Sequence, residues 1–273
     1  MINSHIRTSK QENGENPYLW PMLRTLPYFR ALLRAVEAGF YDQFEMKPPI
    51  LDLGSGDGRF AGVVFRKPID VGLDPEFVSL REAKRGGSYR SLVQALGSRI
   101  PYPDAHFSSA FSNSVLEHIA NLQEVLHEVA RVLRPGSPLI FCVPNHRWPE
   151  SLQIAGWLKG VGLRTLASTY TRFFTRVSRH INMLSPEEWK GLLVGAGFKL
   201  EDHWHYFPPR ALHALEWGHY LGFPSLVSRW MTGRWILAPN RWSLAMTERS
   251  IRRLAQAKKD PEGTYTWIVA RKS

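Results

Sequence analysis

The stretch from Leu51 to Phe60, which reads LDLGSGDGRF, decides the fold of this chain. Ile50, Leu51 and Leu53 form the short apolar run of a buried parallel strand, and glycines follow at alternate positions before a helical pattern begins. A glycine turn lets a ligand approach the main chain, and the N–H groups of the next helix favour polar or anionic ligand atoms. The stretch predicts a strand, a tight turn and a helix start at a ligand site; a loop that merely needs small residues is the alternative.

A second strand pattern, from Ile69 to Leu73, ends in Asp74 and Pro75, which places a carboxylate 22 residues after Asp52. An acidic side chain at the tip of the second strand of a βαβ unit is placed to accept hydrogen bonds from both hydroxyls of a ribose. We therefore expect a nucleoside ligand. The glycine spacing is G-x-G-x-G, whereas dinucleotide-binding folds carry G-x-G-x-x-G.

At this point the sequence resembles the class I S-adenosylmethionine-dependent methyltransferases, and within them the small-molecule, methyltransferase type 11-like group. Further blocks carry the resemblance in the family's order: Ile100–Asp104 (IPYPD), Phe111–Ile119 (FSNSVLEHI), Glu128–Gly136 (EVARVLRPG), Leu184–Trp189 (LSPEEW) and Ala196–Phe198 (AGF). The resemblance implies an α/β fold with a Rossmann-like, doubly wound, seven-stranded and mostly parallel sheet, an antiparallel last strand and helical cap insertions. It also implies S-adenosylmethionine as the cofactor.

The resemblance assigns ten residues to the cofactor: Asp52, Gly54, Gly56, Gly58, Asp74, Pro75, Leu96, Asn113, Ser114 and His118. For His118, contact with the substrate and a packing or helix-capping role are the alternatives. The family often carries an acid near Leu96 that accepts a hydrogen bond from the adenine amino group, but none stands here, so adenine recognition stays open. Asn113 is expected beside the sulfonium, because ligands bind outside the carboxyl ends of strands where the strand order reverses. Members that methylate nucleic-acid bases carry Asn/Asp-Pro-Pro-aromatic at this position, and Asn113-Ser114-Val115 argues against that activity.

The whole chain, residues 1–273, is interpreted as one methyltransferase domain. Its predicted parts are N-terminal helices (16–48), a cofactor-binding core (49–144), a lid insertion (145–184), a helix and strand (185–206), an aromatic and basic insertion (207–262) and the last strand (263–273). In the resembling family such leading helices close over the cofactor, which would bring Tyr18, Arg24 and Tyr28 toward its methionine end. Packing and surface roles are the alternative for these three side chains.

Composition bounds the class of protein. With 44% hydrophobic and 12% aromatic residues, the chain has enough apolar side chains for one core with a cap. No residue run has the length of an apolar transmembrane helix, and Met1–Gly14 is polar without a signal-peptide core, so we expect a cytoplasmic protein. The single cysteine, Cys142, lies in an apolar strand pattern that predicts a buried thiol. The histidines lack partners at metal-ligand spacing, so no metal site is predicted.

The net charge of +11 is unevenly distributed. Residues 1–144 hold 16 Lys or Arg against 15 Asp or Glu, whereas residues 145–259 hold 17 against 7. The later half therefore predicts an acidic, phosphorylated or membrane partner, with a merely solvated basic surface as the alternative. Tryptophans and arginines alternate between Trp217 and Trp242, which suits an anionic membrane surface or a lipid-like acceptor. A helical cap packed on the sheet is the competing interpretation, and nucleic acid is not the expected partner.

The lid insertion carries the candidate catalytic residues. Its apolar residues from Leu152 to Leu163 suggest a helix face, and Arg179–Met183 resembles the family's return of the lid toward the site. His180 is the first candidate for a general base and His146 the second, with packing roles as alternatives. The resemblance is specific for the fold and the cofactor and not for the substrate. We expect methyl transfer to a small lipophilic or acidic metabolite, with oxygen favoured over nitrogen or carbon. An RNA or protein methyltransferase and a non-catalytic cofactor-binding module are the alternatives; the oligomeric state is not predicted.

Overall fold

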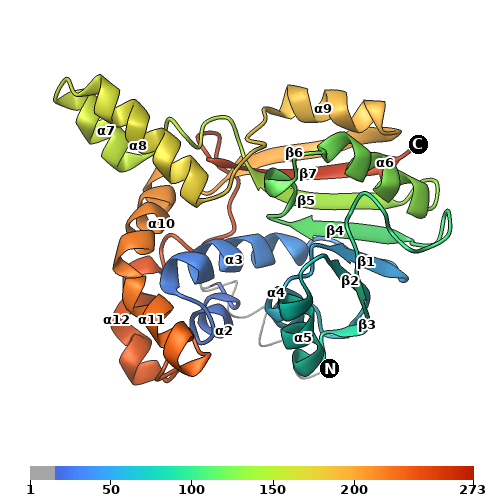
Figure 1. Cartoon of the computed structure of the whole chain (residues 1–273), viewed down its shortest axis with the longest axis horizontal. Coiled ribbons are helices and arrows are strands. Elements are labelled where there is room, and N and C mark those ends of the chain that lie inside the picture. Colours follow the sequence, from blue (N-terminus) through green and yellow to red (C-terminus); the bar gives the residue numbers. More distant parts are fainter. Residues whose placement is uncertain (1–15) are drawn as a thin grey trace.

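The computed structural model describes residues 16–273. One seven-stranded sheet has the order β3-β2-β1-β4-β5-β7-β6, in which only the pairs of β7 with β5 and β6 are antiparallel (Figure 1). The predicted mostly parallel sheet with an antiparallel last strand is confirmed. The strands are β1 Ile50–Leu53, β2 Ile69–Asp74, β3 Tyr89–Gln94, β4 Ser109–Asn113, β5 Pro138–Pro144, β6 Phe198–Tyr206 and β7 Tyr265–Lys272.

The strand order reverses between β1 and β4. Leu51 of β1 pairs with Val71 of β2 on one side and with Ala110 of β4 on the other, and all four residues of β1 are buried. This burial explains the continuous apolar run in the sequence, because a central parallel strand is covered on both faces. The chain leaves β1 and β4 in opposite directions, which opens a crevice at their carboxyl ends.

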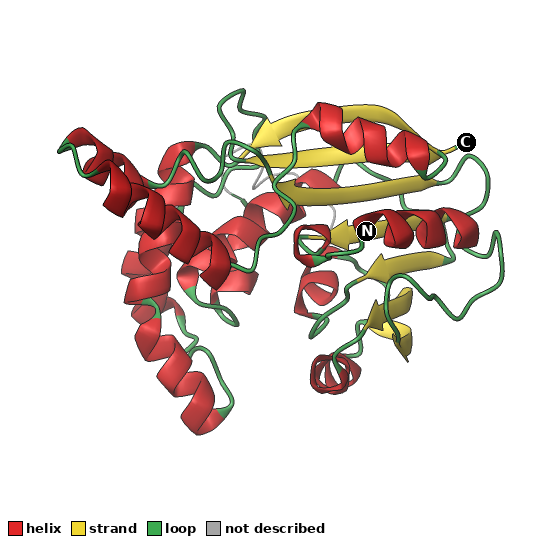
Figure 2. Cartoon of the chain, turned by 45° about the horizontal axis from the view of Figure 1, so that its top comes forward, coloured by secondary structure: helices red, strands yellow, loops and turns green. Residues whose placement is uncertain are grey.

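Two apolar clusters sandwich the sheet. On one face, α3 (Tyr28–Tyr41) packs with α4 (Arg59–Val64), and the cluster contains Phe40 and Trp267. On the other face lie α6 (Leu122–Val132) and α9 (Pro186–Gly195), side by side over the strands in Figures 1 and 2. Ile268, the neighbour of Trp267 in β7, belongs to this second cluster, as the alternation of side chains along a strand requires. Helix α5 (Phe77–Gly86) packs on β3 at the edge.

The insertions form a helical body beside the sheet. Helices α7 (Gln153–Gly160) and α8 (Arg164–Val177) make a hairpin that projects from the molecule, and α10 (Pro209–Leu221), α11 (Phe223–Thr232) and α12 (Arg241–Ile251) continue along the same side (Figures 1 and 2). Helix α10 packs against α3. The cap therefore rests largely on the N-terminal helices.

A buried carboxylate joins the two insertions. Glu216 of α10 accepts hydrogen bonds from the backbone N–H groups of Gln153 (2.6 Å) and Ile154 (3.2 Å) at the start of α7, and from the hydroxyl of Tyr170 in α8 (2.7 Å). The carboxylate thus satisfies the unpaired N–H groups of a helix N-terminus, where negative charge is favoured. The hairpin and α10 are held as one unit.

The N-terminal helices are α2 (Leu19–Leu23) and α3, which separate at Pro27. Glu37 of α3 is fully buried and accepts hydrogen bonds from Asn113 Nδ2 (2.7 Å), Ser114 Oγ (2.8 Å) and the Tyr206 hydroxyl (3.2 Å). Arg34 pairs with the same carboxylate at 2.8 Å, and this pairing raises the pKa of Arg34 against the effect of burial. One carboxylate therefore fixes α3, β4 and β6 together.

No helix within residues 16–273 has the length and apolarity needed to cross a membrane. The expectation for Met1–Gly14 concerns residues outside those that the structure describes. Cys142 is a buried free thiol, as predicted, and its S–H donates to Asn113 Oδ1 at 3.2 Å.

Replacing Glu37 with glutamine should lower the free energy of unfolding by about 3–5 kcal/mol, because Arg34 is left without its buried partner. Urea unfolding measures this as a lower midpoint at unchanged slope. The exposed Glu150→Gln variant is the control, with an expected change within about 0.5 kcal/mol. Equal midpoints for Glu37→Gln and wild type would show that the pair does not hold α3 in place.

Candidate functional site: a nucleoside cofactor cavity at the strand switch point

A cavity of about 1050 Å³ opens at the carboxyl ends of β1, β2 and β4. Its volume lies at the upper end of the roughly 300–1,000 Å³ of ligand pockets, which leaves room for a second molecule beside a nucleoside. Of the ten residues assigned to the cofactor, all except Gly58 line it: Asp52, Gly54, Gly56, Asp74, Pro75, Leu96, Asn113, Ser114 and His118. The structure thus brings them together around one space.

The three glycines of the turn serve different purposes. All have positive φ, at 81° for Gly54, 54° for Gly56 and 73° for Gly58, where other residues are strained. A side chain at Gly54 would collide with Val115 at 2.5 Å, and one at Gly58 would meet Tyr89 at 3.0 Å. Gly56 has open space around it, so its main chain is the part of the turn that a ligand can approach.

Asp74 is fixed at the rim of the cavity. Its Oδ2 accepts a hydrogen bond from the Gly56 N–H (2.9 Å) and its Oδ1 accepts one from the Glu76 N–H (2.8 Å). A carboxylate has about four acceptor positions, so two remain for the hydroxyls of a ribose. The residues present therefore fit a nucleoside cofactor.

Asp52 forms the floor below the turn. It is buried, and the Tyr89 hydroxyl donates to its Oδ2 at 2.6 Å. Burial, with a smaller contribution from the charge of Asp74, raises the pKa of Asp52 to about 7, although the hydrogen bond from Tyr89 opposes the shift. Asp52 is thus poised to gain charge near neutral pH when a cation binds above it.

The side of the cavity where adenine is expected is mostly apolar. Leu96 is 63% exposed and shares this wall with Val78, Gly97 and Ser98. The Ser98 hydroxyl and the main chain of this loop are the polar groups available in place of the family's acid. Val78 and Ser98 were missed from the sequence, because no spacing rule separates them from other loop residues.

The leading helices cover the cavity through residues other than those expected. Met22, Leu26, Arg30 and Arg34 line it, whereas Tyr18 is buried and its hydroxyl donates to Asp42. Among the described residues that line this cavity, Arg24 and Tyr28 do not occur. The absence of Tyr18, Arg24 and Tyr28 from this lining agrees with the packing and surface roles that the sequence left open for them.

The switch point itself is strained and fully bonded. Asn113 and Ser114 line the cavity, but their side chains bond to Glu37, and Arg34 donates to the Asn113 carbonyl oxygen at 3.2 Å. Ser114 has a φ of 52°, a conformation that costs a residue other than glycine about 1–3 kcal/mol. These residues therefore offer main-chain surface to a ligand, held in place by the buried pair.

A titratable cluster lies next to the switch point, in and beside the 3₁₀ turn η1 (Leu116–His118). His118 lines the cavity, and its Nδ1 lies 2.8 Å from the carbonyl oxygen of Arg179, which fixes Nδ1 as the donor. Its Nε2 is 3.8 Å from Oε1 of the buried Glu117. Burial lowers the pKa of His118 and raises that of Glu117 to about 8, so both are neutral at pH 7.

The predicted base His180 lies behind His118. Their ring centroids are 5.6 Å apart, Trp148 covers the other side of His180 at 4.7 Å, and Nδ1 of His180 is buried without a hydrogen-bond partner among the described residues. Burial, helped by His118 and His219, lowers the pKa of His180 to about 3. The returning lid segment is near the site as expected, since the Ile181 and Asn182 N–H groups donate to the Glu117 carbonyl oxygen.

The second candidate, His146, is exposed after β5 and lies 6.3 Å from the ring of His205, and it is not among the described residues that line the cavity. The structure therefore does not bring His146 to the cofactor residues. Within residues 16–273, no group of three or more His, Cys, Asp or Glu side chains could hold a metal ion.

Salt bridges connect three helices at the mouth of the cavity. Glu82 of α5 pairs with Arg229 of α11 at 2.6 Å and with Arg59 of α4 at 3.3 Å. Arg229 and Arg30 also lie over the ring of Trp235, at 5.4 and 5.7 Å. The aromatic and basic insertion thus closes one side of the cavity.

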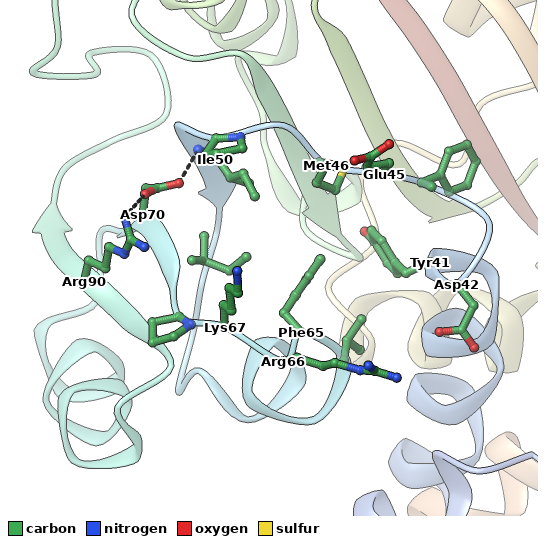
Figure 3. A pocket seen from close by; sticks show the side chains of 15 residues that line it. Tyr41, Asp42, Glu45, Met46, Ile50, Phe65, Arg66, Lys67, Asp70 and Arg90 are labelled. Carbon is green, nitrogen blue, oxygen red and sulfur yellow. Dashed lines mark hydrogen bonds and ion pairs between the residues drawn. The ribbon is translucent and has the colours of Figure 1, made fainter. Parts of the chain in front are cut away.

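A second hollow, of about 670 Å³, lies at the opposite end of β1 and β2 (Figure 3). Tyr41, Met46 and Phe65 border it, and Asp70 bonds to the Ile50 N–H and to Arg90 at its edge. It lies at the amino ends of the strands, away from the switch point where ligands of such folds bind.

Comparisons with known proteins agree with this geometry. Residues 51–141 match the family described as methyltransferase domain. An uncharacterized methyltransferase of Mycobacterium sp. (strain JLS) is 29% identical over 127 residues, which cover 45% of this chain and 49% of that protein. The O-methyltransferase cnsE of Penicillium expansum is 26% identical over 56% of this chain and 52% of its own length. The chain thus spans about half the length of the curated relatives that it matches.

The fold is also found among solved structures. A SAM-dependent methyltransferase from Thermotoga maritima superposes with a TM-score of 0.53 at 17% identity, over 90% of each chain. The architecture of this chain is therefore the one found in solved S-adenosylmethionine-dependent methyltransferases. The match of residues 51–141 to the methyltransferase domain family, together with this fold, supports S-adenosylmethionine as the cofactor of the cavity.

The role of Asp74 can be measured by calorimetry with S-adenosylhomocysteine. Asp74→Ala removes charge-assisted hydrogen bonds to the ribose worth about 1.5–3 kcal/mol, so Kd should rise about 10- to 150-fold. The control is Asp202→Ala, whose side chain is 58% exposed on β6. If Asp74→Ala folds normally and binds as tightly as wild type, Asp74 does not hold the ribose.

Proposed function

We propose that this protein transfers the methyl group of S-adenosylmethionine to a small lipophilic or acidic acceptor, with a hydroxyl oxygen as the favoured position. The observation that carries this proposal is the composition of the cavity at the strand switch point. Next to the nucleoside cradle, the apolar side chains of Leu26 and Trp235 line the cavity, and Arg30 and Arg179 add cationic groups. The name of the relative cnsE, an O-methyltransferase, supports oxygen as the acceptor.

When bound in the cavity, S-adenosylmethionine would supply an electrophilic methyl group on its sulfonium and would be left as S-adenosylhomocysteine. The residues of this chain then have two tasks, to align the acceptor and to receive its proton. His118 is suited to the second task, since Nδ1–H donates to Arg179 and Nε2 is left to accept. With a pKa of about 3, His180 is a weak proton acceptor, and we propose that it supports the ring of His118.

Methyl-labelled S-adenosylmethionine identifies the acceptor class. The protein is incubated with lipid, polar and nucleic-acid fractions of a cell extract, and we expect label in the lipid fraction or in small anionic metabolites. Label in RNA or protein would instead support the alternative that uses the basic surface for a macromolecule. S-adenosylhomocysteine binding without label in any fraction would indicate a non-catalytic module.

The pH dependence of kcat/KM separates the candidate bases. A base must be deprotonated to accept a proton, and burial holds the pKa of His118 below its ordinary 6.5. The value of kcat/KM should therefore be constant above about pH 6.5 and fall at lower pH, where His118 becomes protonated. His118→Ala should lower kcat by about 10²–10⁴-fold. His180→Ala should change the pH at which kcat/KM falls on the acid side, while the affinity of this variant for the cofactor stays unchanged.

If activity instead rises through pH 8 and the rise vanishes in Glu117→Gln, then Glu117, whose pKa is about 8, is the base. An unchanged kcat in His118→Ala would also remove His118 from the proton transfer.

A further inference from the structure

We propose that the two insertions form a docking surface for an anionic lipid membrane. The surface, called here the insertion face, is defined by six exposed apolar side chains: Trp157, Val161, Leu166, Trp230, Trp242 and Met246. The first three lie on the α7–α8 hairpin and the others on α11 and α12, so all belong to the helical body beside the sheet (Figures 1 and 2).

Several of the exposed apolar side chains on this face follow one side of a helix. Trp230 is 86% exposed, Trp242 89% and Met246 86%. Trp242 and Met246 are four residues apart in α12, which puts them on one side of that helix. In α8, Leu166, Phe173 and Val177 form a similar exposed stripe, while Ala167 and Phe174 are buried against the rest of the protein. Helix α8 thus has one apolar side inward and another outward.

The chain around these apolar side chains carries mainly positive charge, although α12 also contains Glu248, which pairs with Arg252 at 3.5 Å. Residues 151–186 contain Lys159, Arg164, Arg172, Arg176 and Arg179 and no Asp or Glu. Residues 217–247 contain Arg229, Arg234 and Arg241 and again no Asp or Glu. Tryptophan and arginine have apolar bodies and polar ends, so together they suit the boundary between acyl chains and anionic head groups.

The positive charge and the aliphatic side chains of the insertion face also distinguish among the partners that could bind it. A symmetric dimer through this face would set the same arginines of two copies against each other without a carboxylate between them. Single-stranded nucleic acid would use arginines and aromatic rings, but it offers nothing to the exposed Val161, Leu166 and Met246. An anionic bilayer matches both the charge and the aliphatic surface.

The insertion face lies near the entrance of the cofactor cavity, which suggests what a membrane contact would serve. Arg179 follows α8 and Arg229 lies in α11, and both line the mouth of the cofactor cavity. A membrane on the insertion face would therefore lie close to the entrance, where a lipophilic acceptor could pass from the bilayer. This use rests on the proposed function, whereas the membrane contact does not.

The test is sedimentation of the full chain with vesicles. Vesicles of phosphatidylcholine with phosphatidylglycerol should bind wild type, vesicles of phosphatidylcholine alone should bind it far less, and added salt should weaken binding because charges are screened beyond roughly 8 Å. The triple variant Arg164→Gln, Arg172→Gln, Arg176→Gln should bind about 100-fold more weakly, since each arginine near such a surface contributes about fivefold. These arginines avoid Arg229, which is paired with Glu82.

The apolar contribution is tested by Trp230→Ser with Trp242→Ser, and brominated lipids should quench tryptophan fluorescence in wild type but far less in this variant. The control is Val194→Ser, an exposed apolar residue of α9 on the other side of the molecule, which should bind vesicles as wild type does (Figure 1). S-adenosylhomocysteine binding should be unchanged in all three variants.

Failure of wild type to bind anionic vesicles overturns the proposal, as does binding that Val194→Ser reduces as much as the double tryptophan variant. Dimerisation lost in the tryptophan variant, or tight binding to single-stranded RNA lost in the arginine variant, without vesicle binding would assign the face to those partners instead. Because vesicle binding needs no turnover, a missing methyl acceptor would leave this result unaffected.

Discussion

The carboxylate of Glu37 brings together parts of the chain that are far apart in sequence. Its hydrogen-bond partners are 76 residues away at Asn113 and 169 residues away at Tyr206. A buried charge without partners is costly, so the pairing with Arg34 and three further donors is a condition of the fold. The strained Ser114 is held by the same carboxylate, and the walls of the cofactor cavity therefore depend on one side chain of α3.

The cofactor half of the site could be predicted because its determinants are local. The glycine turn, the acid at the tip of the second strand and the switch-point asparagine occur at fixed spacings, since each is dictated by one βαβ unit. The resemblance also implied a seven-stranded, mostly parallel sheet with an antiparallel last strand, which the structure confirms. What it did not indicate is how each glycine contributes, which depends on Val115 and Tyr89 from other elements.

The remainder of the site depends on contacts that periodicity does not encode. An apolar stripe from Leu152 to Leu163 predicts which side chains share a face, but not whether another element covers that face, and Val161 is in fact exposed. Likewise, Glu37 stands in the sequence as one acid in an apolar helix, with no signal that its partners lie on β4 and β6. The weak basicity of His180 follows from burial by Trp148 and His118, which only the folded chain reveals.

The hydrogen bonds of Glu216 bear on whether the two insertions can be exchanged separately between related proteins. Its carboxylate on α10 accepts hydrogen bonds from the first N–H groups of α7 and from the hydroxyl of Tyr170. One insertion therefore supplies the buried acceptor, and the other supplies its donors. In a chimaera with only the first insertion, the first N–H groups of α7 would lack their acceptor. In one with only the second insertion, the buried carboxylate of Glu216 would lack its donors. The two segments, although separated in the chain by α9 and β6, are therefore expected to be gained, lost and exchanged as one module.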